Sequence, residues 1–388
     1  MKLVDVAEFY AEKGGGVRTY VDRKLRAGAA LGHEVVVVAP GPRDFEESRE
    51  GGRIVWVKSP PIPLDPRYRL FVSPSALHAV LDREQPDVVE GSSPYGGGWA
   101  VATWRGAAKK SLIHHQDPVA VFGHSLLDRH LSGAAIDAAF FPIWTALRRL
   151  ARRYDTTVVA GEWLRERLDA FGIPRVAAVP FGIEPEPFLE ARPDPALRRQ
   201  LVARAGVAPD APLLVCVSRH HPEKRLPTLI RAVHRVNRAT PLALAIFGDG
   251  PSRPAVERAA RKGPGVYVAG YTRDRAELAA AVATADALLH GSAAETYGLV
   301  LAEALCAGTP LIAPDAGGGG DLARPEHSET YRAGDVEGCA AAIRRLLVRD
   351  PAALAAAARA DAATRIRTLD QHFAALFEHY ADLRVVDR

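Results

Sequence analysis

Residues 213–218 read LLVCVS and residues 242–247 read LALAIF, two short runs of mostly apolar side chains. The longer segment that separates them has a helical pattern. Uninterrupted apolar strands that alternate with helices are typical of a parallel sheet whose two faces are both covered. This stretch therefore predicts an α/β domain built around a buried parallel sheet.

The same alternation continues along most of the chain, in one series over about residues 1–185 and a second over about residues 212–365. The other strand-like runs are residues 34–39, 87–90, 111–114, 156–160, 176–179, 266–269, 287–290 and 311–313. A proline-rich, charged segment at 181–210 reads as the linker between the two series. We expect an α/β chain of two doubly wound parallel-sheet, Rossmann-like domains that face a central cleft, with ligands at the carboxyl ends of the strands.

The composition excludes several other classes of protein. The chain has 388 residues, of which 48% are hydrophobic and 25% charged, as in an average two-domain globular protein. Its net charge of +4 is too small for a dedicated nucleic-acid binder. We find no membrane-spanning apolar stretch, no signal peptide and no metal-ligand spacing among the three cysteines. We therefore expect a cytoplasmic protein with no metal site and no nucleic-acid partner.

Two segments have the chemistry of anion sites. Gly14, Gly15 and Gly16 precede a helical pattern, and a glycine turn that opens a helix offers backbone N–H groups to an anion. Arg219 and Lys224 follow the run at 213–218, and a guanidinium with an ammonium suits a diphosphate. The structural alternatives are a plain loop at the glycines and a solvated basic loop at the cations.

Two carboxylates lie eight positions apart in the segment ETYGLVLAE at residues 295–303. We expect Gly298 to open a helix that carries Glu303 and Gly308 to end it. At 1.5 Å per helical residue, Glu295 and Glu303 are up to about 12 Å apart, which suits two ends of one extended ligand better than a shared metal or a glycosidase pair. The alternative is a pair of solvated glutamates on a surface helix.

Histidines follow the strand-like run at residues 111–114, within the segment IHHQDP at 113–118. A histidine at the end of this strand would point into the cleft from the first domain. The alternative is a histidine with a purely structural role.

Six motifs, taken in order, resemble one known family. They are GGGV at 14–17, SRHHPEK at 218–224, IFGDGP at 246–251, AGYT at 269–272, ETYGLVLAE at 295–303 and AGTPLIAPDAGG at 307–318. This set is similar to the large family of retaining glycosyltransferases of GT-B fold, whose mark is the Glu-x7-Glu motif. The resemblance implies an acceptor-side domain at 1–190, completed by a C-terminal helix at 366–388, and a donor-binding domain at 191–365.

The resemblance also implies roles for individual residues. Arg219 and Lys224 would bind the donor diphosphate. Glu303 would bind the ribose, and Glu295 would bind the hydroxyls of the transferred sugar. His115 would be the active-site histidine beside that sugar.

The preceding His114 is the alternative residue for this role. Further substrate contacts that the resemblance implies are Gly15, Gly16, Gly248, Thr272, Tyr297, Gly298 and Leu299. The chain departs from the usual pattern at 290–292, where His-Gly-Ser replaces a common proline-serine pair. It also has Tyr297 in place of phenylalanine and Asp321 in place of glutamate. These changes surround the sugar position and leave the donor sugar open.

The expected activity is transfer of a hexose, with mannose from GDP-mannose preferred and a UDP-hexose as the alternative donor. We expect retention of configuration, no cofactor, no metal and no enzyme nucleophile. The acceptor would be a carbohydrate, a lipid-linked glycan or a small molecule. Segment 122–154, which ends in four arginines, would either rest on the inner face of an anionic membrane or be a solvated helix. A nucleotide-sugar epimerase of the same fold and a non-enzymatic nucleotide-sugar sensor are the rival functions.

Overall fold

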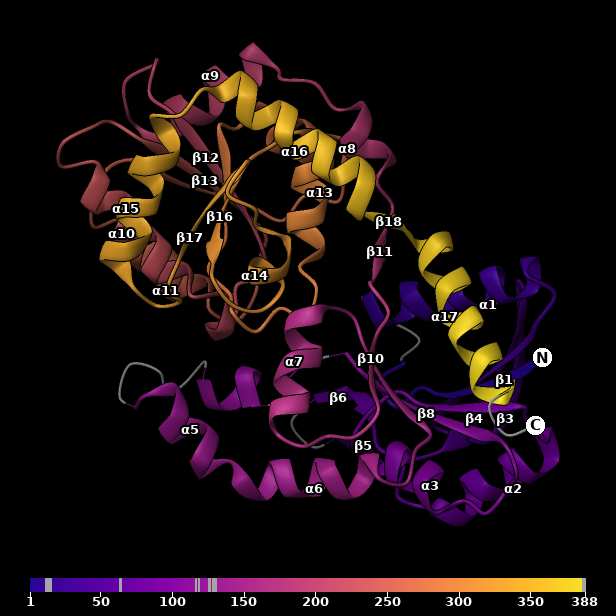
Figure 1. The fold of residues 1–388 in the computed structure, drawn as a ribbon. Coiled ribbons are helices and arrows are strands. Elements are labelled where there is room, and N and C mark those ends of the chain that lie inside the picture. The colour runs from indigo at the N-terminus through magenta and orange to yellow at the C-terminus, as the bar shows by residue number, and fades with distance from the viewer. Residues whose placement is uncertain are drawn as a thin grey trace. The chain divides into compact units, whose positions relative to one another are not determined.

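A computed structural model of the chain describes residues 1–10, 16–62, 65–115, 117, 119–124, 127 and 131–385. The chain divides into two compact units (Figure 1). Unit 1 contains Met1–His115, Phe140–Phe181 and Leu369–Arg388, and unit 2 contains Gln116–Ala139 and Gly182–Thr368.

Unit 2 is built on a six-stranded, fully parallel sheet with the order β14-β13-β12-β15-β16-β17. Its strands are β12 (Leu213–Val217), β13 (Ala243–Phe247), β14 (Val266–Gly270), β15 (Ala287–Leu289), β16 (Leu311–Pro314) and β17 (Ser328–Tyr331). The chain adds strands outward from β12 on one side and then returns to add strands on the other. This is the doubly wound order of a Rossmann fold, with its switch point between β12 and β15.

Helices cover both faces of the unit 2 sheet. On one face α10 (Leu226–Val236) packs against α11 (Arg253–Ala260) and α15 (Val336–Leu347). The other face carries a series of helices in mutual contact, namely α9 (Pro195–Ala205), α12 (Arg275–Thr284), α13 (Leu299–Ala307) and α16 (Pro351–Arg365). Short helices complete the unit, namely η1 (Val119–His124), α5 (Gly133–Ala139), α8 (Glu186–Glu190), η2 (Pro222–Lys224) and α14 (Gly318–Leu322).

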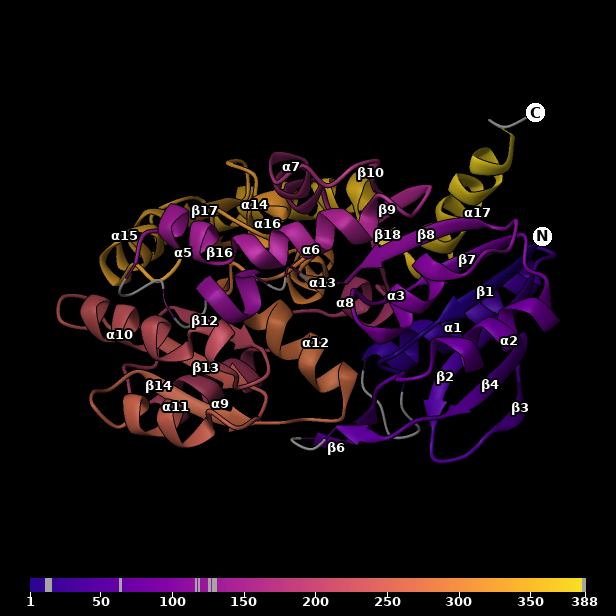
Figure 2. The ribbon, with the colours of Figure 1, turned by 90° about the horizontal axis from the view of Figure 1, so that it is seen from below.

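Unit 1 contains an eight-stranded sheet with the order β10-β9-β8-β7-β1-β2-β4-β3, whose central strands are visible side by side in Figure 2. All neighbours are parallel except β3 and β4. The strands are β1 (Lys2–Val6), β2 (Glu34–Gly41), β3 (Phe45–Arg49), β4 (Gly52–Lys58), β7 (Val88–Gly91), β8 (Lys109–His114), β9 (Thr156–Val159) and β10 (Val176–Ala178). Two short pairs stand apart, β5 (Pro61–Ile62) with β6 (Asp65–Arg69), and β11 (Gly182–Ile183) with β18 (Arg367–Thr368), the latter in unit 2.

The C-terminal helix α17 (Leu369–Val385) belongs to unit 1, where it packs against α1 (Gly16–Ala30) (Figure 1). Phe373, Leu376 and Phe377 of α17 are buried in the same apolar core as strands β1 and β2. The remaining helices of this unit are α2 (Pro74–Glu84), α3 (Gly96–Thr103), α6 (Phe141–Ala151) and α7 (Glu162–Ala170). None of the described helices is long and apolar enough to cross a bilayer.

Each run that the sequence predicted as a strand forms one, and the predicted α/β fold class is confirmed. The division between the units differs from the expected one. It falls after Phe181 rather than after residue 190, because β11 pairs with β18 and α8 packs on α12 and α13. Residues 116–139 also group with unit 2, although we had expected them in the first domain.

A buried cluster of charges joins the centre of the unit 1 sheet to its helices. Lys24 of α1 is fully buried, and its Nζ lies 2.7 Å from Asp5 of β1 and contacts Glu90 of β7. Tyr380 of α17 donates a hydrogen bond to the same Glu90. Burial raises the pKa of Glu90 to about 7, while Lys24 opposes that rise. Lys24 therefore compensates two carboxylates that have little access to water.

Replacing Lys24 by methionine should destabilise the protein by about 3–5 kcal/mol, because the two carboxylates would be left buried without their cation. The matched control is Arg26→Met on the same helix, where the side chain is 45% exposed and lies 3.7 Å from Glu50. That change should cost no more than about 1 kcal/mol. Urea unfolding followed by circular dichroism measures both, and equal unfolding midpoints would show that the cluster does not stabilise the fold.

Candidate active site

The loops that leave the carboxyl ends of β12 and β15 carry most of the predicted site residues of unit 2. These two strands are neighbours in the sheet, and the crossover connections leave them in opposite directions. In a doubly wound sheet this switch point leaves a crevice at the carboxyl edge, where ligands bind. Arg219 and Lys224 follow β12, and Glu295 follows β15.

The structure brings Lys224 and Glu295 into direct contact. The Lys224 Nζ lies 2.5 Å from Oε1 of Glu295, with the two side chains 11% and 23% exposed. Burial alone would raise the pKa of Glu295, but the Lys224 ammonium holds that pKa below its usual value. Glu295 is therefore an ionised carboxylate at neutral pH. The sequence predicted both residues but not their pairing, since 71 positions separate them.

Glu223 organises the basic loop after β12. Its carboxylate is nearly buried and lies 3.6 Å from the Arg219 Nη2, 3.4 Å from the His221 Nδ1 and 3.4 Å from the Lys224 Nζ. The Arg219 side chain is 80% exposed despite this contact, so its guanidinium can reorient in solvent. Glu223 was not among the predicted site residues, although it lies inside the SRHHPEK motif.

Glu303 lies on the first half of α13 and has a different partner. Its Oε1 accepts a hydrogen bond of 3.1 Å from Nη2 of Arg275, and the same Nη2 is 3.4 Å from the Glu184 carbonyl oxygen. Burial raises the pKa of Glu303, and Arg275 partly opposes that rise. Sequence reasoning missed Arg275, although it stands only three positions after the predicted Thr272.

Helix α13 begins and ends as predicted, with Gly298 and Gly308 as its capping residues. Gly298 has a φ of +87°, and a Cβ at this position would lie 2.8 Å from Leu301 Cδ1. A residue with a side chain is therefore strained there. Leu299 is 46% exposed beside it, whereas Tyr297 is buried and its pKa is raised to about 12 by that burial.

Two other predicted contacts have roles within the fold. Gly248 follows β13 with a φ of +122°, and a Cβ there would lie 1.9 Å from the carbonyl oxygen of Ser218, so the close approach of two loops requires glycine. Thr272 donates a 2.7 Å hydrogen bond to Glu277 and accepts one of 3.2 Å from the Asp274 backbone. Thr272 thus stabilises the first turn of α12.

In unit 1, His115 directly follows β8 and packs edge-on against the ring of Tyr20, with 5.5 Å between ring centroids. Burial, with a further contribution from Lys24, lowers the pKa of His115 to about 4, so its ring is neutral at pH 7. His114 is buried within the strand. Gly16 begins α1, and Gly15 lies outside the described residues.

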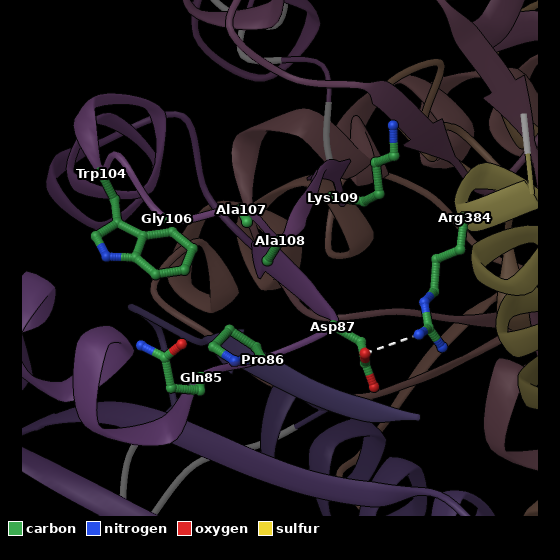
Figure 3. A pocket seen from close by; sticks show the side chains of 9 residues that line it. All are labelled: Gln85, Pro86, Asp87, Trp104, Gly106, Ala107, Ala108, Lys109 and Arg384. Carbon is green, nitrogen blue, oxygen red and sulfur yellow. Dashed lines mark ion pairs between the residues drawn. The ribbon is translucent and has the colours of Figure 1, made fainter. Parts of the chain in front are cut away.

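A cavity of about 300 Å³ lies elsewhere in unit 1, at the amino ends of β7 and β8 (Figure 3). Asp87 and Arg384 meet there at 2.8 Å, and Asp87 also accepts a 2.7 Å hydrogen bond from the Lys2 backbone. None of the predicted site residues lines this cavity. Within the described part of the chain, no group of three or more His, Cys, Asp or Glu side chains is placed to hold a metal ion.

Two family models match the chain, one for each half. Residues 14–187 match the model described as Glycosyltransferase Family 4, and residues 211–349 match the model described as Glycosyl transferases group 1.

Curated relatives match over most of their length. A Mycobacterium tuberculosis protein named GDP-mannose-dependent alpha-(1-6)-phosphatidylinositol dimannoside mannosyltransferase is 32% identical over 319 residues, covering 80% of this chain and 79% of that protein. A GDP-mannose-dependent alpha-mannosyltransferase of Mycolicibacterium smegmatis is 33% identical over 334 residues, covering 84% and 82%.

Solved structures share the fold over nearly the whole chain. Sucrose-phosphate synthase from Thermosynechococcus elongatus superposes with a TM-score of 0.73 at 20% identity, covering 99% of both chains. The catalytic domain of starch synthase IV from Arabidopsis thaliana gives 0.65 at 15% identity, also covering 99% of both. The predicted resemblance is thus confirmed: the chain belongs to the glycosyltransferases of GT-B fold and is an enzyme that uses a nucleotide sugar.

Proposed function

We propose that the chain transfers mannose from GDP-mannose to a glycan or lipid-linked acceptor, with retention of configuration and without a metal ion. The observation that carries this proposal is the group of two cations and two carboxylates at the switch point of unit 2, where Lys224 lies 2.5 Å from Glu295 and Arg219 shares Glu223 with Lys224. The names of the relatives, which are GDP-mannose-dependent mannosyltransferases, support the choice of donor.

Lys224 and Arg219 would bind the donor diphosphate. When the bond between the sugar C1 and the phosphate oxygen breaks, negative charge grows on the diphosphate, and preorganised cations stabilise it. The exposed Arg219 can turn its planar fork onto phosphate oxygens, while the less exposed Lys224 supplies a compact point charge. These two residues would take the place that a divalent cation has in other transferases.

Glu295 would accept hydrogen bonds from hydroxyls of the transferred mannose, and Glu303 from the ribose hydroxyls. Both are carboxylates held near a cation, Lys224 for the first and Arg275 for the second. The backbone N–H groups at the start of α13, next to Gly298 and Leu299, would favour the growing negative charge.

Retention follows if the acceptor hydroxyl attacks C1 from the face that the diphosphate leaves. The departing phosphate oxygen would then accept the proton of that hydroxyl, so the enzyme needs no nucleophile. From unit 1, we propose that neutral His115 contacts the donor sugar and that the turn at Gly15 and Gly16 approaches the phosphates. The contact between His115 and the sugar does not require a protonated imidazole.

Helix α6 suggests where a lipid-linked acceptor would be met. Its buried face is formed by Trp144, Leu147 and Leu150. Phe141, in contrast, is 59% exposed, and Arg149 and Arg152 face solvent. An exposed aromatic residue beside a row of arginines suits an anionic bilayer surface. We propose that α6 rests on the inner face of such a membrane.

The central test is product analysis with GDP-mannose, GDP-glucose and UDP-glucose, using α-methyl mannoside and mannosylated lipid extracts as acceptors, with and without EDTA. We expect GDP-mannose to raise the unfolding temperature, since a ligand at 100 times its Kd stabilises by about 2.7 kcal/mol. We also expect an α-mannoside by NMR, at a rate that EDTA leaves unchanged. A β-product would contradict retention, and loss on chelation that Mn²⁺ restores would contradict metal independence. A new sugar nucleotide formed without acceptor would favour an epimerase, and binding without turnover would favour a sensor.

Lys224→Ala and Arg219→Ala should each lower turnover by at least about 10²-fold while the protein stays folded, because each removes charge that the transition state needs. The control is Arg231→Ala. Arg231 lies on α10, after the loop that carries Arg219 and Lys224, and its guanidinium donates to Thr228 rather than to Glu223 or Glu295. Its turnover should be near normal. If the two loop variants also work at normal rates, the diphosphate binds elsewhere.

Substitutions of the two glutamates should impair different steps, nucleotide binding for Glu303 and sugar transfer for Glu295. Glu303→Gln should weaken binding of bare GDP by roughly 10–100-fold, as expected for one lost hydrogen bond to a charged group. Glu295→Gln should leave the affinity for bare GDP nearly unchanged, because GDP has no sugar for this residue to contact, yet it should cut turnover or relax the choice of sugar. Calorimetry with GDP and with GDP-mannose separates the two. Equal loss of GDP affinity in both variants would refute the assignment.

The double change Arg149→Gln with Arg152→Gln should weaken binding to phosphatidylglycerol vesicles by about 10-fold or more, at roughly 1 kcal/mol for each arginine. Binding to phosphatidylcholine should be weak for every variant. The charge-matched control is Arg258→Gln with Arg261→Gln near the end of α11, which should bind as the unaltered protein does. Vesicle flotation measures this, and equal binding by both double variants would exclude α6 as the contact.

A further inference from the structure

His290 is held rigidly at the carboxyl end of β15, in the segment where the sequence departs from the family pattern. Its backbone N–H donates a 2.8 Å hydrogen bond to the Ile312 carbonyl, and its own carbonyl accepts a 2.5 Å hydrogen bond from the hydroxyl of Tyr331. Tyr331 is itself buried in the core of unit 2. The backbone of His290 is therefore fixed by the backbone of β16 and by a side chain of β17.

The imidazole of His290 is buried, with 2% of the residue exposed, and its Nε2 has no hydrogen-bond partner among the described residues. A buried polar atom without a partner costs free energy and calls for an explanation. Oε1 of Glu295 lies 3.7 Å from this Nε2, which is too far for a hydrogen bond. That oxygen already accepts from the Lys224 Nζ at 2.5 Å.

The ring is neutral at physiological pH, because burial and the nearby Lys224 ammonium lower the pKa of His290 to about 4. A neutral imidazole has one N–H donor. A carboxylate only accepts hydrogen bonds, so an imidazole that faces it is best placed with the N–H on Nε2. Oε1 of Glu295 thus has two donors near it. The Lys224 Nζ already donates to it, whereas the Nε2–H of His290 is too far away to do so.

We propose that His290 is a positioning residue for Glu295, which takes over the carboxylate when the donor diphosphate attracts Lys224. The Lys224 ammonium would move toward the phosphates, and the Nε2–H of His290 would close the gap of 3.7 Å to Oε1. Glu295 would then stay ionised and oriented toward the hydroxyls of the transferred sugar. This inference rests on the proposed role of Lys224 and names the residue that makes Glu295 selective.

The test compares His290→Gln with His290→Met, because the two side chains have nearly the same length and shape but only glutamine has an N–H at the position of Nε2. We expect His290→Met to lower kcat with GDP-mannose by about 10-fold or more and to reduce the preference for GDP-mannose over GDP-glucose. His290→Gln should retain most of both. His290→Met should also weaken the calorimetric affinity for bare GDP by a few-fold, because GDP binding is what forms the bond to Glu295, whereas His290→Gln should leave that affinity nearly unchanged. Equal behaviour of the two variants would overturn the proposal.

A matched control separates positioning from stability. His327 is 1% exposed in the same unit, precedes β17 and lies 3.2 Å from Asp361. His327→Met should destabilise the unit to a similar degree without changing the preference between donor sugars. In the Glu295→Gln background, the difference between His290→Gln and His290→Met should disappear, and its persistence would mean that His290 acts through another group.

A second readout requires no sugar transfer. Long-range ¹H–¹⁵N spectra should show the Nε2–H of His290 shifting downfield when GDP is added, and this shift should be lost in Glu295→Gln. An unmoved His290 resonance with GDP bound would overturn the inference. A shift of His290 in a protein that binds GDP but transfers no sugar would uphold the coupling to Glu295 and refute the proposed function instead.

Discussion

The reversal of strand order between β12 and β15 is the constraint on which the geometry of the candidate site depends. Because the two strands are parallel neighbours, the loops that follow them meet at one edge of the sheet, although 71 residues separate Lys224 from Glu295. A partly buried ion pair can then form, because each partner loses some of its contact with water and the other compensates its charge. The sheet holds the loops in place, and the loops carry the charged side chains of the candidate site.

The sequence predicted most strands of both large sheets, because these strands are apolar on both faces and therefore form continuous hydrophobic runs. It did not predict β1, whose Asp5 interrupts such a run, because the compensating Lys24 comes from a helix and cannot be seen in the local pattern. The hairpin of β3 and β4 was missed since it lies at the sheet edge with charged side chains in β3.

The candidate site shows the same division. Glycines and charged residues within motifs, such as Gly298 and Lys224, could be chosen from spacing and resemblance. The partners of these residues could not, because pairings such as Arg275 with Glu303 arise from packing between separate elements. Gly248 remains a predicted ligand contact, and the nearby carbonyl of Ser218 also gives it a reason within the fold itself. Motifs therefore indicate the location of a site more reliably than the contacts of its individual residues.

The return of α17 to unit 1 has a consequence for the order of events during synthesis. Most of unit 2 is one continuous stretch that leaves the ribosome before residue 369, whereas the core of unit 1 needs side chains from both ends of the chain. Tyr380, the hydrogen-bond partner of Glu90, is synthesised 290 residues after it. Although unit 1 is begun first, unit 2 is expected to reach its native state first, and a nascent chain that stalls near residue 368 should expose the unfinished unit to chaperones and proteases.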